Sequence, residues 1–331
     1  MKKVFLLGAV ALLASCESVV EVPVPAHTPQ LALRYTLSNQ PVTTQYRQDF
    51  SGRSLYVSTS LSTLATTRLQ GRADATVELR EAGGQVVEQF RPDTAARRPT
   101  DYNYGTYTAV RGYVGRPGHT YTLRATAPGV APLEATLTLP APATLDAANF
   151  VAKPQVVGPG PYSPIYDYYG QLSFAILDPA ATTDYYAVYA RVLDAAGQFW
   201  GYVYQDYSLR DQSGPDINLN RFDLSSAYDV YKILPISDAG RNGQRIAFSN
   251  PVGFYHVGAY DPLHPTPPPP AYLELIVSTL PVATYDFYQS VQRYYDTNGN
   301  PFAEPAPLRS NLPGGYGLFG GATDTMLRIK L

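Results

Sequence analysis

The chain has 331 residues, of which 45% are hydrophobic and 16% charged, and its formal net charge at pH 7 is −2. This charge excludes a protein that binds nucleic acid through a strongly basic surface. The low charged fraction, together with 28 tyrosines and 30 prolines, is typical of an exported β-protein with many short strands and turns, and the length suggests two domains.

Residues 1–15 predict a bacterial lipoprotein signal peptide. In "MKKVFLLGAVALLASC" two lysines precede an apolar segment over 4–13, which is shorter than the roughly 20 residues of a membrane-spanning helix. The letters "LAS" before Cys16 resemble a lipobox, in which the cysteine thiol receives a diacylglycerol. We expect lipidated Cys16 to anchor the chain to the outer membrane, because two or more acyl chains hold a protein stably. Residues 16–30 predict an extended tether.

Cys16 is the only cysteine in the chain, which excludes intrachain disulfides and thiolate metal clusters.

The segment 31–145 predicts an immunoglobulin-like or prealbumin-like β-sandwich. Runs of alternating polar and apolar residues are separated by turn residues at the spacing of roughly 8–12 residues that a sandwich shows. The runs cover 31–38, 54–62, 75–82, 86–92, 105–113, 120–128 and 133–140. Gly83 and Gly84 predict a hairpin turn, since glycine readily adopts a positive φ.

The segment 146–331 predicts a second β-rich domain, with a turn-rich junction over 141–164. Strands are expected at 170–179, 184–194, 199–207, 244–250, 271–280 and the C-terminus. At about 281–295, apolar residues recur every three or four positions, which predicts one short amphipathic helix with Thr279 as its cap. The expected apolar face consists of Val282, Tyr285, Tyr288 (or Phe287), Val291 and Tyr295.

Aromatic residues provide the candidate ligand-binding site. Trp200, Tyr202 and Tyr204 alternate along one predicted strand, so they are expected on one face. If this stripe of aromatic residues is exposed, it would suit stacking on sugar rings or binding at a protein interface. The alternative is that the stripe packs in the core. A nearby loop adds four tyrosines: Tyr162, Tyr166, Tyr168 and Tyr169.

No residue pattern predicts a catalytic or metal site, and no cofactor is expected. The four histidines are His27, His119, His256 and His264. None belongs to a recognisable nucleophile–base motif, and the spacing of His256 and His264 matches no standard zinc pattern. No segment indicates the paired carboxylates of a glycoside hydrolase, so a hydrolase is the least favoured class.

The motif "GYGLFG" (315–320) has the G-x-G-x-x-G spacing of phosphate-binding loops. Such a loop must open a helix whose N-terminal N–H groups meet the phosphate. Here "GATDTMLRIKL" follows, which predicts a loop and a terminal strand. The glycines therefore predict a tight turn with positive φ, and we expect Tyr316, Leu318 and Phe319 to anchor the last strand in the core.

The C-terminal sequence resembles the signature of domain of unknown function 4249, a family of envelope lipoproteins from Bacteroidota. The matching motifs are "NPFAEP" after a predicted helix and "SNLPGGYGLF" near the end, and the opening "CESVVEVPVP" is also similar. The resemblance covers essentially the whole chain after Cys16. It implies an exported lipoprotein that often accompanies TonB-dependent outer-membrane receptors, and it carries over no established activity.

Together these features predict a lipid-anchored, mainly β envelope protein that binds its ligand without transforming it. The expected role is that of an accessory to a TonB-dependent receptor. The alternative is surface adhesion or glycan binding through the tyrosine-rich loop.

Overall fold

The computed structural model describes residues 26–62, 69–93, 98–99, 101, 103–153, 156–158, 165–205, 224–225, 232–256, 268–297 and 306–331. The predicted signal peptide, Cys16, most of the predicted tether and Tyr162 lie outside the described residues.

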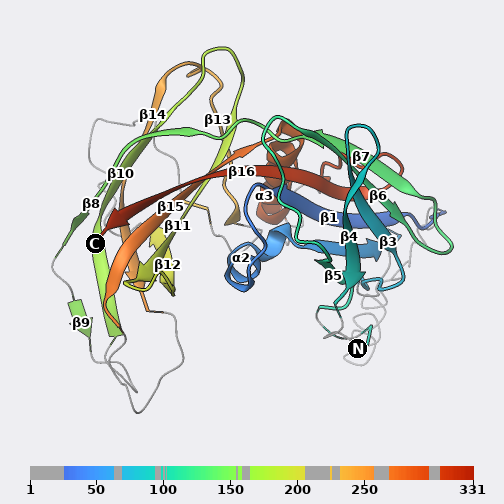
Figure 1. Cartoon of the computed structure of the whole chain (residues 1–331), viewed down its shortest axis with the longest axis horizontal. Helices are drawn as coiled ribbons and strands as arrows, with labels where there is room; N and C mark the ends of the chain where they lie inside the picture. Colours follow the sequence, from blue (N-terminus) through green and yellow to red (C-terminus); the bar gives the residue numbers. More distant parts are fainter. Residues whose placement is uncertain are drawn as a thin grey trace, which may run out of the picture.

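The described chain is built mainly from β-strands, which confirms the predicted fold class (Figure 1). In the first half the strands are β1 (Leu31–Ser38), β2 (Leu55–Thr59), β3 (Thr76–Glu81), β4 (Val86–Pro92), β5 (Thr106–Ala109), β6 (Thr120–Thr126) and β7 (Leu133–Thr138). They continue with β8 (Thr144–Ala152), β9 (Val156–Gly158), β10 (Ile165–Leu177), β11 (Tyr185–Asp194), β12 (Phe199–Gln205), β13 (Ile236–Ser237), β14 (Arg245–Tyr255), β15 (Pro270–Leu280) and β16 (Tyr316–Lys330). The helical elements are α2 (Thr44–Asp49), the 3₁₀ turn η1 (Ser51–Arg53) and α3 (Val282–Thr297).

The described strands form one 16-stranded mixed sheet. Its order is β7-β6-β3-β4-β5-β2-β1-β16-β15-β11-β12-β14-β10-β8, with β13 paired to β11 and β9 to β10. Strand β8 lies within the segment predicted as a turn-rich junction, which corrects that prediction. The immunoglobulin-like or prealbumin-like form of the first half and the domain boundary at 145/146 stay predictions.

Strand β16 joins the two halves of the sheet. Its first residues pair in parallel with β1, and its later residues pair antiparallel with β15. Figure 1 shows β16 running across the molecule between the two groups of strands. The predicted terminal strand is therefore confirmed, and it begins inside the glycine motif at Tyr316.

Over the residues of β16 that pair with β1, the other edge of β16 is covered by side chains and not by a strand. Asn311 exchanges two hydrogen bonds with the backbone of Phe319, at 2.7 and 2.9 Å. The hydroxyl of Thr284, on α3, accepts from the N–H of Gly321 at 3.0 Å. These contacts replace a missing neighbouring strand, because a buried backbone group needs a hydrogen-bond partner.

The glycine motif serves close backbone packing. Gly317 has a φ of 111°, and a Cβ there would lie 2.0 Å from the backbone oxygen of Leu33 on β1. Gly315 lies against the Leu133 side chain of β7, so the far end of the sheet curls over β16. Leu318 and Phe319 are fully buried as predicted, whereas Tyr316 is 52% exposed and does not anchor the strand.

Helix α3 confirms the predicted amphipathic helix and the middle of its predicted apolar face. The buried residues are Thr284, Phe287, Tyr288, Ser290 and Val291. Val282 and Tyr295, at the two ends of the predicted face, are exposed. Thr279 lies in β15 and not at a cap position; the carbonyl of Pro281 accepts the first backbone N–H groups of the helix.

A buried arginine–aspartate pair fixes the segment after β1 against β16. Arg53 donates to both carboxylate oxygens of Asp324, at 2.7 and 3.2 Å, and the two side chains are 5% and 0% exposed. Ser278 of β15 donates to the same carboxylate at 2.5 Å, and the guanidinium lies 4.0 Å from the ring centroid of Phe50. Burial lowers the pKa of Arg53, but Asp324, Tyr46 and Tyr189 together outweigh it and raise the pKa well above its ordinary value.

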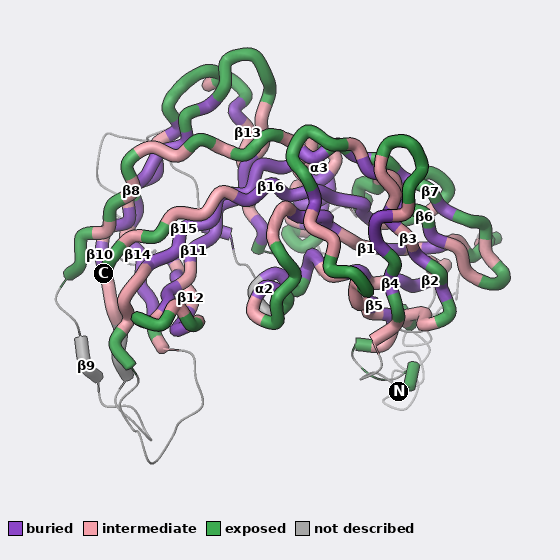
Figure 2. Tube along the Cα trace, in the orientation of Figure 1, coloured by how far each residue is buried: buried purple, intermediate pink, exposed green. Residues whose placement is uncertain are grey.

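The apolar core consists of three clusters that follow the sheet. One fills the first half, around Leu79, Tyr121 and Leu123; the second lies in the other half, around Phe174, Trp200 and Phe248. The third packs α3 and α2 against the middle of the sheet. Buried residues accordingly run along β16, β15 and α3 (Figure 2).

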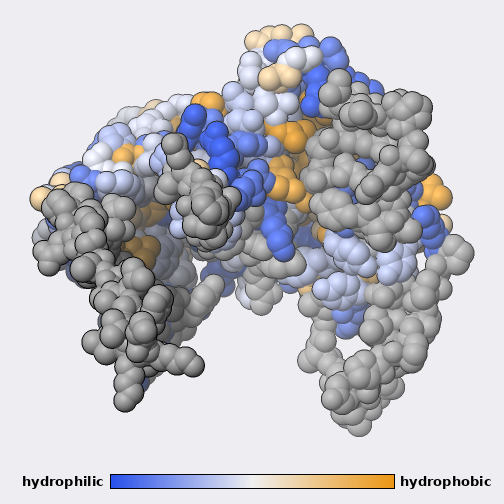
Figure 3. Space-filling view, turned by 180° about the vertical axis from the view of Figure 1, so that it is seen from behind, coloured by the Kyte–Doolittle hydropathy of each residue, from blue (hydrophilic) through white to orange (hydrophobic). Residues whose placement is uncertain are grey.

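Seen from behind, hydrophobic residues reach the described surface in a band near the middle of the molecule, with hydrophilic residues around them (Figure 3). Among the described residues, no helix is long and apolar enough to cross a membrane.

Candidate functional site

The structure separates the residues of the predicted aromatic site. Tyr166, Tyr168 and Tyr169 lie in strand β10 and not in a loop, because β10 begins at Ile165. The side chain of Tyr166 lies outside the described part. Tyr168 and Tyr169 are both half-buried, and as neighbours in a strand they point to opposite faces of the sheet.

Trp200 does not share a face with Tyr202 and Tyr204. Val192 is opposite Gly201 and Leu193 is opposite Phe199, so Trp200 is the extra residue of a β-bulge. The bulge turns the indole inward, where it is 1% exposed and its N–H donates to the carbonyl of Pro268 at 2.6 Å. Trp200 therefore packs in the core, which is the alternative that the sequence left open for this strand.

Tyr168 shares the inner face with Trp200. Its ring stacks on Phe254 at 5.2 Å between centroids and meets Trp200 edge to face at 5.6 Å. The ring of His256 lies 5.1 Å from Trp200, and burial lowers the pKa of this histidine. The imidazole is therefore neutral at pH 7 and belongs to the same aromatic packing.

Four tyrosines gather on the opposite, outward face of β10, β14 and β12. Tyr169 and Tyr204 are both opposite Gly253, one on each neighbouring strand. Tyr202 and Tyr255 lie two residues away along their strands, which places them on the same face. We call these four residues the tyrosine surface: Tyr169, Tyr202, Tyr204 and Tyr255.

Gly253 makes room for one ring of the tyrosine surface. A Cβ at Gly253 would be 2.6 Å from the Cζ and hydroxyl oxygen of Tyr204, so the tyrosine ring occupies the space above this residue. The rings of Tyr204 and Tyr255 are 5.9 Å apart, and Tyr255 is 46% exposed. The result is a broad aromatic surface with polar hydroxyl tips, a composition that suits binding to a protein or a sugar.

On β10 and β14 the outward face beside the tyrosine surface is polar and uncharged, whereas on β11 Arg191, opposite Tyr202, forms an ion pair with Glu274 at 2.6 Å. Gln171 and Ser173 follow Tyr169 on the same side of β10, and both form hydrogen bonds with Ser249 of β14, at 3.0 and 3.1 Å. A partner that binds here therefore meets hydroxyl and amide groups, and it does not have to displace an ion pair from these residues.

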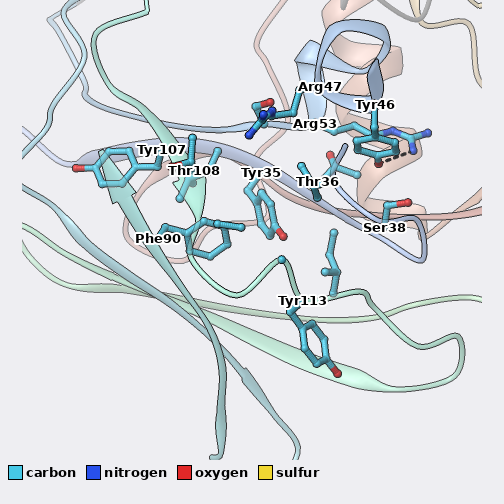
Figure 4. Close-up of a pocket in the computed structure, with 16 residues that line it drawn as sticks. Tyr35, Thr36, Ser38, Tyr46, Arg47, Arg53, Phe90, Tyr107, Thr108 and Tyr113 are labelled. Carbon is cyan, nitrogen blue, oxygen red and sulfur yellow. Dashed lines mark hydrogen bonds between the residues drawn. The ribbon is translucent and has the colours of Figure 1, made fainter. Parts of the chain in front are cut away.

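A second candidate is a small cavity beside α2, where Tyr35 and Phe90 point toward each other (Figure 4). Their ring centroids are 5.0 Å apart in an edge-to-face arrangement. The volume of the cavity is about 90 Å³, whereas sites for small molecules usually measure about 300–1,000 Å³. This cavity accommodates one side chain or one ring, and it is too small for a whole substrate.

Arg47 is exposed at the rim of this cavity, and among the described residues no carboxylate forms an ion pair with it. Tyr113, which also lines the cavity, is held from behind by a residue that does not line it. Buried Glu88 accepts hydrogen bonds from the backbone N–H groups of Val110, Arg111 and Tyr113, at 2.7–3.0 Å. Glu88 thereby fixes the loop that follows β5.

A serine and a histidine meet near the start of the described chain. The Nε2 atom of His27 lies 3.2 Å from the hydroxyl oxygen of Ser60 and 3.1 Å from its carbonyl oxygen. Catalysis by such a pair requires a third group that orients the imidazole. Among the described residues no carboxylate contacts His27, and the contact is explained as a structural hydrogen bond.

One group of described side chains has the composition of a metal site. Carboxylate oxygens of Asp178, Asp184 and Asp238 all lie within 4.8 Å of one another. Asp178 and Asp184 bracket the loop between β10 and β11, and Asp238 follows β13. Burial raises the pKa of Asp238, and the neighbouring carboxylates raise it further.

The sequence predicts part of this geometry: it places Tyr202 and Tyr204 on one face and makes Tyr169 a candidate residue. It does not predict Tyr255, because the expected strand ends at residue 250, whereas β14 continues to Tyr255. The bulge at Trp200 has no signature in the letters around it, since it depends on pairing with β11.

A search of curated proteins finds no match to this chain. One solved structure, titled "Biofilm associated protein - BSP domain", aligns with 95% of this chain at 7% identity and a TM-score of 0.16. The alignment covers 62% of that protein, so the chain spans about three fifths of its length.

A family model, described as "Domain of unknown function (DUF4249)", matches residues 21–328. The match includes both halves of the sheet, the glycine motif and almost all of β16. It agrees with the resemblance carried by the C-terminal motifs, and the chain belongs to this family.

Proposed function

We propose that this chain is a lipid-anchored envelope protein that binds a macromolecular partner through the tyrosine surface and catalyses no reaction. The observation that supports this most strongly is the set of tyrosines on the outward face of β10, β14 and β12, beside uncharged polar residues. Tyrosine is enriched in the central, energetically important part of protein interfaces.

The partner that we propose is a TonB-dependent outer-membrane receptor. The resemblance of the C-terminal motifs to an envelope lipoprotein family supports this choice, and so does the lipobox before Cys16. An anchored chain meets a membrane receptor at high local concentration, which strengthens a modest interface without new contacts.

Co-purification in mild detergent tests the partner. The wild-type chain is expected to retain an outer-membrane receptor, whereas a variant with Tyr204→Ala and Tyr255→Ala is expected to lose at least nine tenths of it. Tyr294→Ala is the matched control, since Tyr294 is similarly exposed, at 40%, but lies on α3. Melting temperatures establish that each variant is folded. The absence of a receptor from the wild-type eluate, or its equal recovery with the double variant, would contradict the proposal.

Glycan binding is the second candidate, and the position of the Tyr204 ring over Gly253 favours it, because sugar rings stack on exposed aromatic rings. A glycan array with the wild-type chain and the Tyr204→Ala variant distinguishes the two candidates. Binding that Tyr204→Ala abolishes would support this second role; binding that survives would assign the sugar to another surface. A hydrolase is not proposed, because no described group completes the Ser60–His27 contact.

Anchoring is tested separately. Cys16→Ser is expected to abolish incorporation of a labelled lipid precursor and to release the chain from the membrane fraction, because serine offers no thiol for the thioether bond. Labelling that persists in this variant would refute the lipobox assignment.

A further inference from the structure

The structure places three carboxylates from two distant loops in one spot, beside β13 at the top of Figure 1. Asp184 and Asp238 are 54 residues apart in sequence, and the pairing of β13 with β11 brings them together. We propose that Asp178, Asp184 and Asp238 form a calcium-binding site.

The charge of this group favours a bound cation. Among the described residues, no lysine or arginine forms an ion pair with any of the three carboxylates. Asp238 is fully buried, at 0% exposure, and Asp178 is 8% exposed. Buried carboxylates are stable as anions only when they are paired with positive charge or coordinate a metal ion.

One oxygen of this group has no partner and is buried. Asp238 accepts a hydrogen bond from the backbone N–H of Asp184 at 2.9 Å through Oδ2. Its Oδ1 atom has no hydrogen-bond partner among the described residues. Such an atom costs free energy unless a ligand or a proton occupies the space that it faces.

The other carboxylates are held in place by donors. Asp178 accepts from the Tyr186 hydroxyl at 2.7 Å and from the N–H of Gly243 at 2.8 Å. Asp184 accepts from the Thr182 hydroxyl at 2.5 Å. These bonds orient the carboxylates, just as hydrogen bonds to the ligands of known metal ions fix the orientation of those ligands.

The two loops are also tied to each other. The side-chain amide of Asn242 donates to the carbonyl of Thr182 at 2.7 Å. Gly243 has a φ of 75°, and a Cβ there would lie 2.6 Å from the Cβ of Ala180. The glycine therefore permits the close approach of the loops, so the carboxylates are positioned before any ion binds.

The distances and ligand type fit calcium. Two oxygens bound to one Ca²⁺ at about 2.4 Å are at most about 4.8 Å apart, and the three carboxylate oxygens lie within 4.8 Å. Calcium prefers oxygen ligands and tolerates irregular geometry, whereas Mg²⁺ requires a near-ideal octahedron. Asp184 is half-buried, which provides a route from solvent for the ion and for water ligands.

Calcium titration of the full chain tests this site. After treatment with a chelator, saturating Ca²⁺ is expected to raise the melting temperature by about 3–4 °C, as expected for a ligand at about 100 times its Kd. Tb³⁺, a luminescent substitute for Ca²⁺, is expected to emit on excitation of tyrosine, because the Tyr186 hydroxyl is bonded to Asp178. Ca²⁺ should displace Tb³⁺ and quench this emission.

Variants distinguish the calcium site from adventitious binding. Asp238→Asn and Asp184→Asn are each expected to weaken Ca²⁺ binding at least tenfold, while Asp74→Asn, a control at an exposed aspartate of the first half, should leave it unchanged. Asp184→Asn keeps the test decisive if the Asp238 variant does not fold, since Asp184 is only half-buried.

Three results would overturn the proposal. The first is a wild-type chain whose melting temperature does not respond to Ca²⁺. The second is a response that Asp184→Asn retains, and the third is an equal response to Mg²⁺. The proposal would also be overturned if Asp238→Asn melted at a higher temperature than the wild-type chain in chelator and neither protein responded to Ca²⁺. That result would assign a shared proton, in place of a metal ion, to the buried Asp238 oxygen.

Discussion

Substitution of Arg53 or Asp324 should lower the stability of the chain more than substitution at most other positions. Asp324→Asn tests this with almost no change in the shape of the side chain. The asparagine amide would direct N–H groups at the guanidinium that now donates to both carboxylate oxygens. Arg53 would remain charged and buried, with its main counter-charge removed.

The expected loss of stability is about 3–5 kcal/mol, which is the usual cost of removing one partner from a buried ion pair. A specific unfolding entropy of about 2.1 cal/mol/K per residue gives about 0.7 kcal/mol/K for a chain of this length. The melting temperature should therefore fall by about 4–7 °C. Arg53→Met with Asp324→Leu should cost much less than the sum of the single changes, because no unpaired charge remains.

The chain contains a matched control for burial. Arg72 and Asp74 also form two hydrogen bonds, both of 2.8 Å, but the Asp74 side chain is 53% exposed. Asp74→Asn should cost at most about 1 kcal/mol. Urea denaturation followed by circular dichroism measures all variants. If Asp324→Asn costs no more than Asp74→Asn, burial does not control the strength of this pair and the reasoning is wrong.

Three further changes test other parts of the fold. Gly317→Ala should cost more than about 3 kcal/mol, because the new Cβ would meet the backbone of β1. Gly314 also has a positive φ, of 72°, but has open space around it, so Gly314→Ala should cost about 1–2 kcal/mol. Equal losses of stability in urea denaturation would refute the role of close packing. Glu88→Gln should cost about 2 kcal/mol by weakening charge-assisted bonds to the loop after β5, with faster amide hydrogen exchange there; unchanged exchange would contradict this. A hydrogen bond from the Tyr113 hydroxyl and, to a smaller extent, one from the Arg116 guanidinium lower the pKa of Glu81. The contribution of Glu81 to stability is therefore present above the unfolded pKa of about 4.5 and is lost as the pH falls through the folded pKa. Glu81→Gln should therefore flatten the acid side of a plot of melting temperature against pH, and an unchanged acid side would exclude Glu81 as a contributor.

The family signature acquires a physical explanation from these contacts. In "SNLPGGYGLF", Asn311 covers the open edge of β16, and Gly317 lets β16 lie against β1. Phe319 is fully buried in the first core cluster. The motif therefore fastens the last strand in the middle of the sheet, as the sequence indicated when no helix followed the glycines.

The amino-acid pattern by itself determined the local elements of this protein. Alternation of apolar residues is a property of neighbouring positions, so it predicted most of the strands, the 83–84 hairpin and the helix near 281–295. The predicted lipobox and the motifs of the family likewise consist of neighbouring residues in the sequence. Tyr202 and Tyr204 alternate along one predicted strand and Tyr169 lies in a tyrosine-rich stretch, so neighbouring positions alone indicated them as binding residues.

Tertiary structure decided which of these residues meet. The bulge opposite β11 moved Trp200 into the core, and pairing across β14 united Tyr169 with Tyr204 and Tyr255. Asp178, Asp184 and Asp238 converge only because β13 pairs with β11, and Arg53 finds Asp324 across 271 residues. Such contacts depend on strand order and register, which long-range hydrogen bonding and burial select together, and no short stretch of sequence contains them.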